Sequence, residues 1–189
     1  MILSLREIFD ILIMTIVVAF LFKDIFQSPK KFTDPLDYYR TKKSVHFEDM
    51  KFAAMVTAPA IILHEFGHKF VAMAFGLEAT FHAAYTWLGG AVILKYLAGF
   101  IFFVPAYVSI LGQATYTSYA VIAIAGPLVN LIIYLAMILL GKYGSVPSKY
   151  EKLVILTRKV NGFLFVFNML PIPGFDGFKF YNAIFHVLF

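Results

Sequence analysis

Long apolar stretches alternate with short charged segments along the chain, and the first stretch predicts a helix over residues 8–26. Its uncharged centre, residues 11–22, has twelve residues. A helix needs about 20 apolar residues to cross a bilayer. The charged ends of Lys23 and Asp24 can extend to the interface, so we predict an N-terminal membrane helix. No small-residue cleavage site follows it, which distinguishes this helix from a cleaved signal peptide.

The most polar part of the chain follows this helix. Residues 23–51 carry seven Lys or Arg side chains and five acidic ones. We predict a polar loop over 27–51 outside the membrane, and a membrane-embedded core over 52–189, where the chain becomes apolar again. No segment is long and polar enough to form a second, soluble domain, so residues 1–189 are predicted to form a single domain.

Ionisable side chains interrupt the first apolar stretch of the core, residues 52–77. They follow twelve uncharged residues, so we expect them partway through a membrane span or at its inner end. These side chains are His64, Glu65, His68 and Lys69.

A second apolar stretch, residues 96–141, contains no charged residue and is too long for one helix. Its second half, 118–141, predicts a membrane-spanning helix. Upstream of that helix we predict short strands and turns over 79–116, because polar and apolar side chains alternate there with the period of a strand. The predicted strands are 79–87 and 101–110. A small open sheet is tolerated at membrane depth only where protein covers it or where it lines a water-filled cavity.

The last apolar segment, residues 153–189, follows a short polar turn over 142–152. The sequence Pro-Ile-Pro-Gly at 171–174 breaks this segment. Such a break frees backbone groups and creates a polar niche at membrane depth, where a carboxylate can reach a metal ion.

Composition narrows the class of protein. Hydrophobic residues make up 61% of the chain and charged residues 14%. Soluble domains have roughly 45–50% and about 25%. Too few polar side chains remain to cover a soluble fold, which excludes a cytosolic single-domain enzyme. The net charge of +5 comes without a basic stripe, which argues against a nucleic-acid partner. The absence of cysteine excludes disulfides, thiolate metal sites and cysteine nucleophiles, so His and carboxylate side chains must hold any metal.

Residues 64–68, His-Glu-Phe-Gly-His, match the pattern HExxH. Helix residues four apart share a face, so His64 and His68 can present two nitrogens to one ion. Glu65 would lie beside that ion without binding it, as a general base for an activated water. A chance match is the alternative. Ionisable groups inside an apolar span are costly unless they are paired or bound, which favours a metal site.

A third ligand has to come from elsewhere in the chain. Beyond the polar loop, the acidic residues after Glu65 are Glu78, Glu151 and Asp176. Glu78 lies at a predicted helix end and Glu151 in a polar turn, whereas Asp176 follows the proline break. Asp176 is therefore the favoured ligand. It could also be the N-cap of a helix that begins near Gly177, and the two roles are compatible.

Together, several motifs resemble the site-2 proteases, which are intramembrane zinc metalloproteases. HEFGH is followed downstream by NMLPIPGFDG at 168–177, which is similar to the NxxPxPxxDG motif of that family. AGPLVN at 125–130 resembles the element that opens the middle core helix of the family, and LGG at 88–90 resembles a short stretch after the HExxH helix. The resemblance extends from about residue 52 to the last residue, 189.

The resemblance implies an α-helical polytopic membrane protein with a three-helix catalytic core. The N-terminal membrane helix and the small membrane-embedded sheet would be additions to that core. It also implies one Zn²⁺ per chain, held by His64, His68 and Asp176, with Glu65 as the catalytic base.

The resemblance gives Asn168 a role in assisting the substrate backbone or the transition-state oxygen. The alternative for Asn168 is an asparagine inside a helix that is satisfied by a neighbouring carbonyl. We expect Asn130 to pair helices across the core, and Gly126 and Pro127 to allow close packing.

Other polar side chains are expected to have structural roles only. His82 and Tyr85 would be satisfied within the predicted sheet. His46 lies in the polar loop and His186 near the last residue, so neither is expected to bind the metal.

The predicted function is hydrolysis of a peptide bond within or next to the transmembrane segment of a protein or peptide substrate in the lipid bilayer. Zinc would activate a water, Glu65 would take its proton, and the substrate would unwind and pair with the predicted strands. One alternative is a transporter or channel that passes metal ions or protons through the same His/Asp cluster. Another is an inactive scaffold for membrane partners.

Two indications of membrane orientation conflict. The positive-inside rule places the polar loop in the cytoplasm. The resemblance places that loop outside and the active site near the cytoplasm, and we follow the resemblance. It also implies a multi-pass protein of a prokaryotic cell membrane that acts on membrane-anchored regulators or remnant signal peptides. No segment has the length or polarity of the PDZ or CBS domains of larger relatives.

Overall fold

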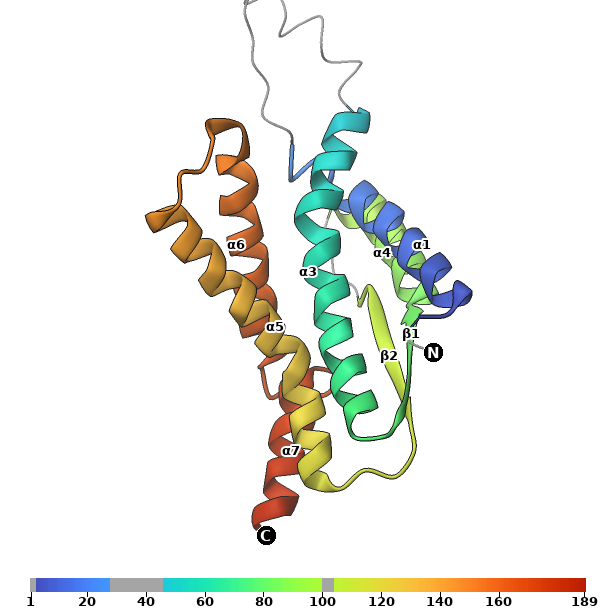
Figure 1. The fold of residues 1–189 in the computed structure, drawn as a ribbon. Coiled ribbons are helices and arrows are strands. Elements are labelled where there is room, and N and C mark those ends of the chain that lie inside the picture. Colours follow the sequence, from blue (N-terminus) through green and yellow to red (C-terminus); the bar gives the residue numbers. More distant parts are fainter. Residues whose placement is uncertain (1–2, 28–45, 100–103) are drawn as a thin grey trace, which may run out of the picture.

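The computed structural model describes residues 3–27, 46–99 and 104–189. Most of the predicted polar loop, 28–45, lies outside these ranges. The described chain is mostly helical, with one small sheet (Figure 1). This agrees with the predicted helical fold and the small sheet.

The N-terminal helix α1 spans Leu5–Phe22, so it begins three residues before the predicted start and ends four before the predicted end. A capping box fixes its beginning. The Glu7 backbone N–H donates to Ser4 Oγ at 3.2 Å, and the Ser4 N–H donates to Glu7 Oε2 at 2.8 Å. These two bonds satisfy backbone donors that the first helical turn leaves free.

Helix α3 spans His46–Ala74 and carries the HExxH pattern in its second half. The prediction of a loop over 27–51 was wrong for residues 46–51, which form the first turns of this helix. Glu48 and Asp49 lie in its first turn, where acidic side chains favour a helix because they oppose the positive end of its dipole. Their charge, which pointed to a loop, instead suits a helix start.

The sheet consists of two antiparallel strands, β1 (Glu78–Ala83) and β2 (Ala106–Leu111). Its register pairs Glu78 with Leu111 at one end and Ala83 with Ala106 at the other. The two predicted strands, 79–87 and 101–110, are confirmed over 79–83 and 106–110, and residues 101–103 lie outside the described ranges.

A helix, α4 (Tyr85–Ala98), lies between the strands, so the prediction of strands and turns throughout 79–116 was wrong. Leu88 and Ala91, three residues apart, are buried on one face, which is helical spacing. The helix ends at Gly99, whose positive φ of 65° suits glycine and whose N–H donates to the Lys95 carbonyl at 3.1 Å.

Three helices complete the chain: α5 (Tyr116–Tyr143), α6 (Ser148–Asn168) and α7 (Asp176–Leu188). The span predicted at 118–141 corresponds to α5, and the break predicted at 171–174 separates α6 from α7. The polar turn predicted at 142–152 is shorter, because α6 begins at Ser148. Among the described residues, α5 is the one helix long and apolar enough by composition to cross a membrane.

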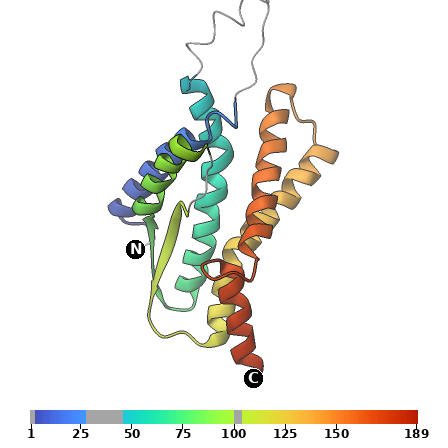
Figure 2. The ribbon, with the colours of Figure 1, turned by 180° about the vertical axis from the view of Figure 1, so that it is seen from behind.

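Helix α3 lies at the centre of the arrangement (Figures 1 and 2). Helices α1 and α4 and the sheet lie on one side of it, and α5 contacts it on the other side, with α6 and α7 packed on α5. The core between α1, α3, α4 and the sheet includes Met14, Val18, Ile61, Phe81 and Leu88.

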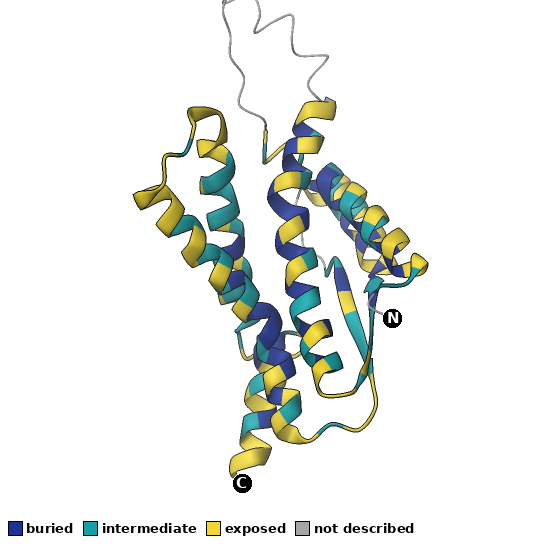
Figure 3. Cartoon of the chain, in the orientation of Figure 1, coloured by how far each residue is buried: buried dark blue, intermediate teal, exposed yellow. Residues whose placement is uncertain are grey.

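Many large hydrophobic residues are exposed rather than buried in this core. Exposed positions recur along the helices (Figure 3). On α5, for example, Ile132, Leu135 and Leu139 are exposed. Apolar surface on this scale favours an apolar environment or a partner over water.

Gly67 lets α3 and α5 approach closely. A Cβ atom at Gly67 would lie 2.9 Å from the Ala125 carbonyl oxygen and 3.0 Å from a methyl group of Val129. Because that oxygen is part of the α5 backbone, the clash could be relieved only if the helices moved apart.

We therefore expect Gly67→Ala to lower the free energy of unfolding by about 1–3 kcal/mol, the usual cost of overpacking. Gly141→Ala is the matched control, since a Cβ at Gly141 meets nothing within 4 Å. Thermal unfolding of the zinc-free proteins in detergent measures both. Equal unfolding temperatures for the two variants would contradict the close approach.

Candidate metal centre

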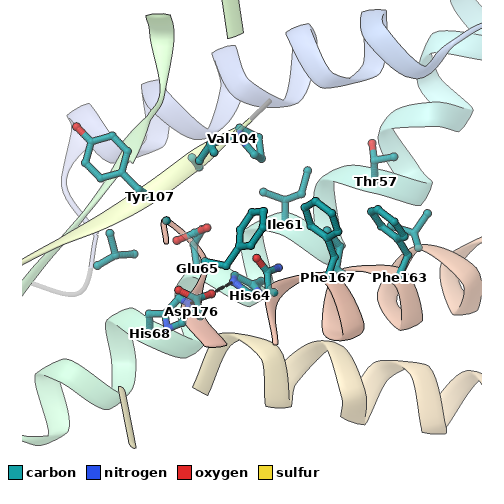
Figure 4. Close-up of a pocket in the computed structure, with 18 of the residues that line it drawn as sticks. Thr57, Ile61, His64, Glu65, His68, Val104, Tyr107, Phe163, Phe167 and Asp176 are labelled. Carbon is teal, nitrogen blue, oxygen red and sulfur yellow. Dashed lines mark hydrogen bonds and ion pairs between the residues drawn. The ribbon is translucent and has the colours of Figure 1, made fainter. Parts of the chain in front are cut away.

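Three predicted ligands meet although they come from two helices far apart in sequence (Figure 4). His64 and His68 lie one turn apart on α3, and Asp176 is the first residue of α7. Asp176 Oδ2 lies 3.0 Å from His64 Nε2 and 3.1 Å from His68 Nε2. All three residues are buried. The prediction that α3 presents both imidazoles on one face is confirmed, and α7 brings the carboxylate to them.

The other nitrogen of each imidazole is bound to an oxygen that only accepts hydrogen bonds. His64 Nδ1 donates to Asn130 Oδ1 and His68 Nδ1 donates to the Ile122 carbonyl, each at 2.7 Å. These bonds place the proton on Nδ1 and leave the Nε2 lone pairs facing one another across 3.2 Å. Two lone pairs and a carboxylate oxygen at this separation favour a cation between them, which is the donor set of a His/carboxylate zinc site.

Asn130 joins three helices around the cluster. From α5, its Nδ2 donates to the Ala60 carbonyl of α3 at 3.0 Å and to Asn161 Oδ1 of α6 at 2.9 Å. The prediction that Asn130 pairs helices across the core is confirmed. Sequence reasoning missed its bond to His64, and it missed Asn161, which is fully buried. A polar side chain inside an apolar segment was the available signal for both.

Gly126 leaves room for the two imidazoles. A Cβ atom there would lie 2.3 Å from His68 Nε2 and 2.8 Å from His64 Nε2. The close packing predicted for Gly126 and Pro127 is confirmed for Gly126, and Pro127 is buried in the same part of α5. The α5 backbone therefore forms one wall of the metal site.

Asp176 is held by packing rather than by a capping role. The N-cap of α7 is Phe175, so the alternative of an N-cap for Asp176 was wrong. Its second oxygen, Oδ1, accepts a hydrogen bond from Lys179 Nζ at 3.3 Å. A Cβ atom at Gly177 would lie 2.4 Å from the Met169 carbonyl group, so only glycine lets the start of α7 pack on the end of α6.

A cavity of about 490 Å³ opens beside the three ligands. Glu65 and Asn168 line it together with the ligands, as do aromatic side chains of α6. Figure 4 shows Glu65 close to His64, His68 and Asp176 on the cavity side. Asn168 is the last residue of α6, so it stands at the end of a helix and not inside one, as its alternative assumed. The two predicted catalytic side chains therefore line the same cavity as the three ligands.

The other acidic residues considered as ligands lie elsewhere. Glu78 begins β1 and Glu151 lies in the first turn of α6, and both are exposed. His186 stacks on the Tyr116 ring with centroids 4.8 Å apart. The side chain of His46 lies outside the described residues.

His82 is satisfied within the sheet, as predicted, but Tyr85 has its partner elsewhere. His82 Nε2 lies 3.0 Å from Ser109 Oγ across the sheet. The Tyr85 hydroxyl donates to Asp10 of α1. Tyr85 itself belongs to α4, so this hydrogen bond lies outside the sheet.

The chain is similar in sequence to known proteins. The chain is 33% identical over 182 residues to a protein of Methanocaldococcus jannaschii named "Putative zinc metalloprotease", and the match covers 93% of this chain and 83% of that protein. A Synechocystis protein with the same descriptive name is 27% identical over 124 residues, 66% of this chain and 28% of that protein. No family model and no solved structure matches the chain. The donor set and these relatives together identify zinc as the cofactor.

The ligand set leads to a prediction about zinc content. The double variant His64→Ala, Asp176→Ala removes two of three ligands, so purified protein is expected to lose its stoichiometric zinc, measured by elemental analysis. His186→Ala, which changes a histidine outside the cluster, is expected to keep it. Unchanged zinc in the double variant would rule out this site.

Another prediction concerns the hydrogen bond between Asn130 and His64. Asn130→Ala leaves all ligands in place but removes the acceptor that orients His64, so zinc affinity is expected to fall about 10–100-fold. Asn161→Ala, which loses a contact to Asn130 but none to a ligand, is the control with a smaller expected loss. Competition with a chelating dye measures both, and equal affinities would show that the bond does not orient the ligand.

Proposed function

The chain belongs to the family of zinc metalloproteases that includes its Methanocaldococcus relative, and from this we propose that it is a site-2-type intramembrane protease. It would hydrolyse a peptide bond in or near the transmembrane segment of a membrane-anchored protein. One observation carries the proposal. Three buried ligands and Glu65 line an apolar cavity in a molecule whose outer surface is rich in exposed hydrophobic side chains.

Zinc, when bound by His64, His68 and Asp176, supplies a Lewis acid that polarises the scissile carbonyl and acidifies the attacking water. Glu65 follows His64 directly on α3 and faces the same cavity. Its carboxylate accepts the proton of the attacking water and then donates it to the nitrogen of the leaving amine.

Asn168 stands at the last turn of α6, on the cavity wall. Its amide N–H group can donate to the substrate carbonyl oxygen as negative charge develops there. Such a donor stabilises the transition state more than the substrate, because the charge it meets exists only during reaction. Asn168 is therefore assigned to carbonyl stabilisation.

The edge strand β2 suits an unwound substrate. Ala106, Val108 and Ile110 of this strand line the cavity that contains the metal ligands. Within the described residues, β2 pairs with β1 alone, so its other edge has free backbone groups. A substrate helix hides its carbonyls in its own hydrogen bonds, and pairing with β2 would hold it extended beside Glu65.

We further propose a multi-pass protein of a prokaryotic cell membrane, with α1, α3, α5 and α6 at membrane depth and the active site near the cytoplasm. The exposed apolar side chains of α5 support contact with lipid. Family membership favours a peptidase over the ion transporter or the inactive scaffold. The carboxylate next to the first histidine favours it as well, because neither alternative requires one.

The test is the variant Glu65→Gln, which keeps the shape of the side chain and removes its basic carboxylate. We expect full zinc binding and a fall in kcat of about 10²–10⁴-fold, the usual contribution of general acid–base catalysis. The measurement is cleavage of a fluorescent single-span transmembrane peptide in detergent or liposomes.

Glu151→Gln is the matched control, because the same change there affects an exposed side chain outside the cavity. It is expected to cleave at the wild-type rate. Cleavage by Glu65→Gln at the wild-type rate would refute the mechanism, and zinc transport into liposomes by that variant would favour the transporter.

A further inference from the structure

Two acidic side chains of α1 are buried where the catalytic proposal gives them no role. Glu7 and Asp10 lie one turn apart on the same face of the helix, and each is only 3% exposed. Buried carboxylates are costly unless they are paired and hydrogen-bonded. The partners of these two carboxylates therefore indicate what they do.

Glu7 joins three elements at one side chain. It forms a buried ion pair with Lys69, which follows the ligand His68 on α3 and is 1% exposed. Its Oε1 also accepts the backbone N–H of Phe81 in β1 at 2.8 Å, and its Oε2 caps α1 through Ser4. One carboxylate thus fixes the metal-binding helix and the first strand relative to α1.

Asp10 contacts the next part of the same region. It accepts a hydrogen bond from the Tyr85 hydroxyl of α4, and its Oδ2 lies 3.7 Å from His82 Nδ1 of β1. Glu7 and Asp10 together form what we call the α1 clamp on β1.

The α1 clamp is connected to the cavity through the register of the sheet. Phe81, whose N–H is held by Glu7, pairs directly with Val108 of β2. Val108 lines the cavity that contains the metal ligands. The Phe81 ring also packs edge-on against Phe66, the residue after Glu65, with centroids 6.3 Å apart. A shift of Phe81 would therefore move Val108 relative to Glu65.

We infer that Glu7 is a positioning residue: by binding Lys69 of α3 and the Phe81 N–H of β1 together, it sets where the β2 edge lies relative to the metal centre. The inference rests on the proposed function, in which β2 holds the unwound substrate. Glu7 touches neither the metal ligands nor the cavity. Its effect is on substrate placement, through β1 and β2.

The experiment compares two double variants that both remove the buried charge pair. In Glu7→Gln, Lys69→Met, the glutamine carbonyl can still accept the Phe81 N–H. In Glu7→Met, Lys69→Met, no acceptor remains. Hydrogen exchange at the Phe81 amide reports whether that acceptor is kept. A buried pair replaced on both sides is often tolerated, so both proteins are expected to fold and bind zinc with wild-type affinity.

The expected result is a change in KM without a change in kcat. The methionine pair should raise KM for the transmembrane peptide about tenfold, the effect of leaving one buried N–H without its acceptor, with kcat unchanged. The glutamine pair should restore KM. Equal KM values in both pairs, or a loss confined to kcat, would overturn the inference.

Two additions keep the result decisive. Binding of the uncleaved peptide is measured in the Glu65→Gln background, so the role of Glu7 is tested even if the protein cleaves nothing and the proposed function fails. If the methionine pair does not fold, Glu7→Leu, Lys69→Met replaces it in the comparison with the glutamine pair. Equal peptide affinity in those two variants would also overturn the inference.

Discussion

Two imidazole nitrogens and one carboxylate oxygen meet within about 3 Å of one another in an apolar interior, and the surrounding helices are arranged to keep them there. Helix α5 contributes most to this arrangement without supplying a ligand. Asn130 and the Ile122 carbonyl orient the two rings, and Gly126 leaves the space between them. The close crossing at Gly67 brings α5 near enough to do so. An apolar helix thereby acts as the support of a polar site.

The ligands could be predicted from the sequence because their chemistry shows in local spacing. His64 and His68 are four residues apart, and Asp176 follows a proline break in an apolar segment. The support of the site could not be predicted in the same way. A backbone acceptor such as the Ile122 carbonyl has no signature in the sequence, since every residue has a carbonyl and only the helix crossing selects one. Asn161 gave a weak signal, because an asparagine can also face solvent or bond within its own helix.

The fold, like the site, could be predicted where the signal is local in the sequence and not elsewhere. Helix α5 was predictable from its long uncharged run, whereas α4 was not. The alternation that indicates a strand continues to Trp87, past the end of β1 at Ala83, and the change to helical spacing rests on two buried residues, Leu88 and Ala91. Charges were misleading for a related reason. Glu7 and Asp10 carry no sign of burial in the sequence, but each is buried against partners from other elements. Burial of a charge depends on a distant partner, which local sequence does not reveal.

Because the ligands are far apart in the sequence, metal binding also affects the stability of the folded chain. His64 and Asp176 are 112 residues apart, so an ion bound to both closes a large loop of the polypeptide. Like any crosslink of this kind, it disfavours the unfolded chain, and its contribution grows with free zinc. Starved of zinc, the cell would hold a protein whose last helix undocks more easily and is exposed to degradation. The lifetime of the protein, and not only its chemistry, would then record the metal supply of the cell.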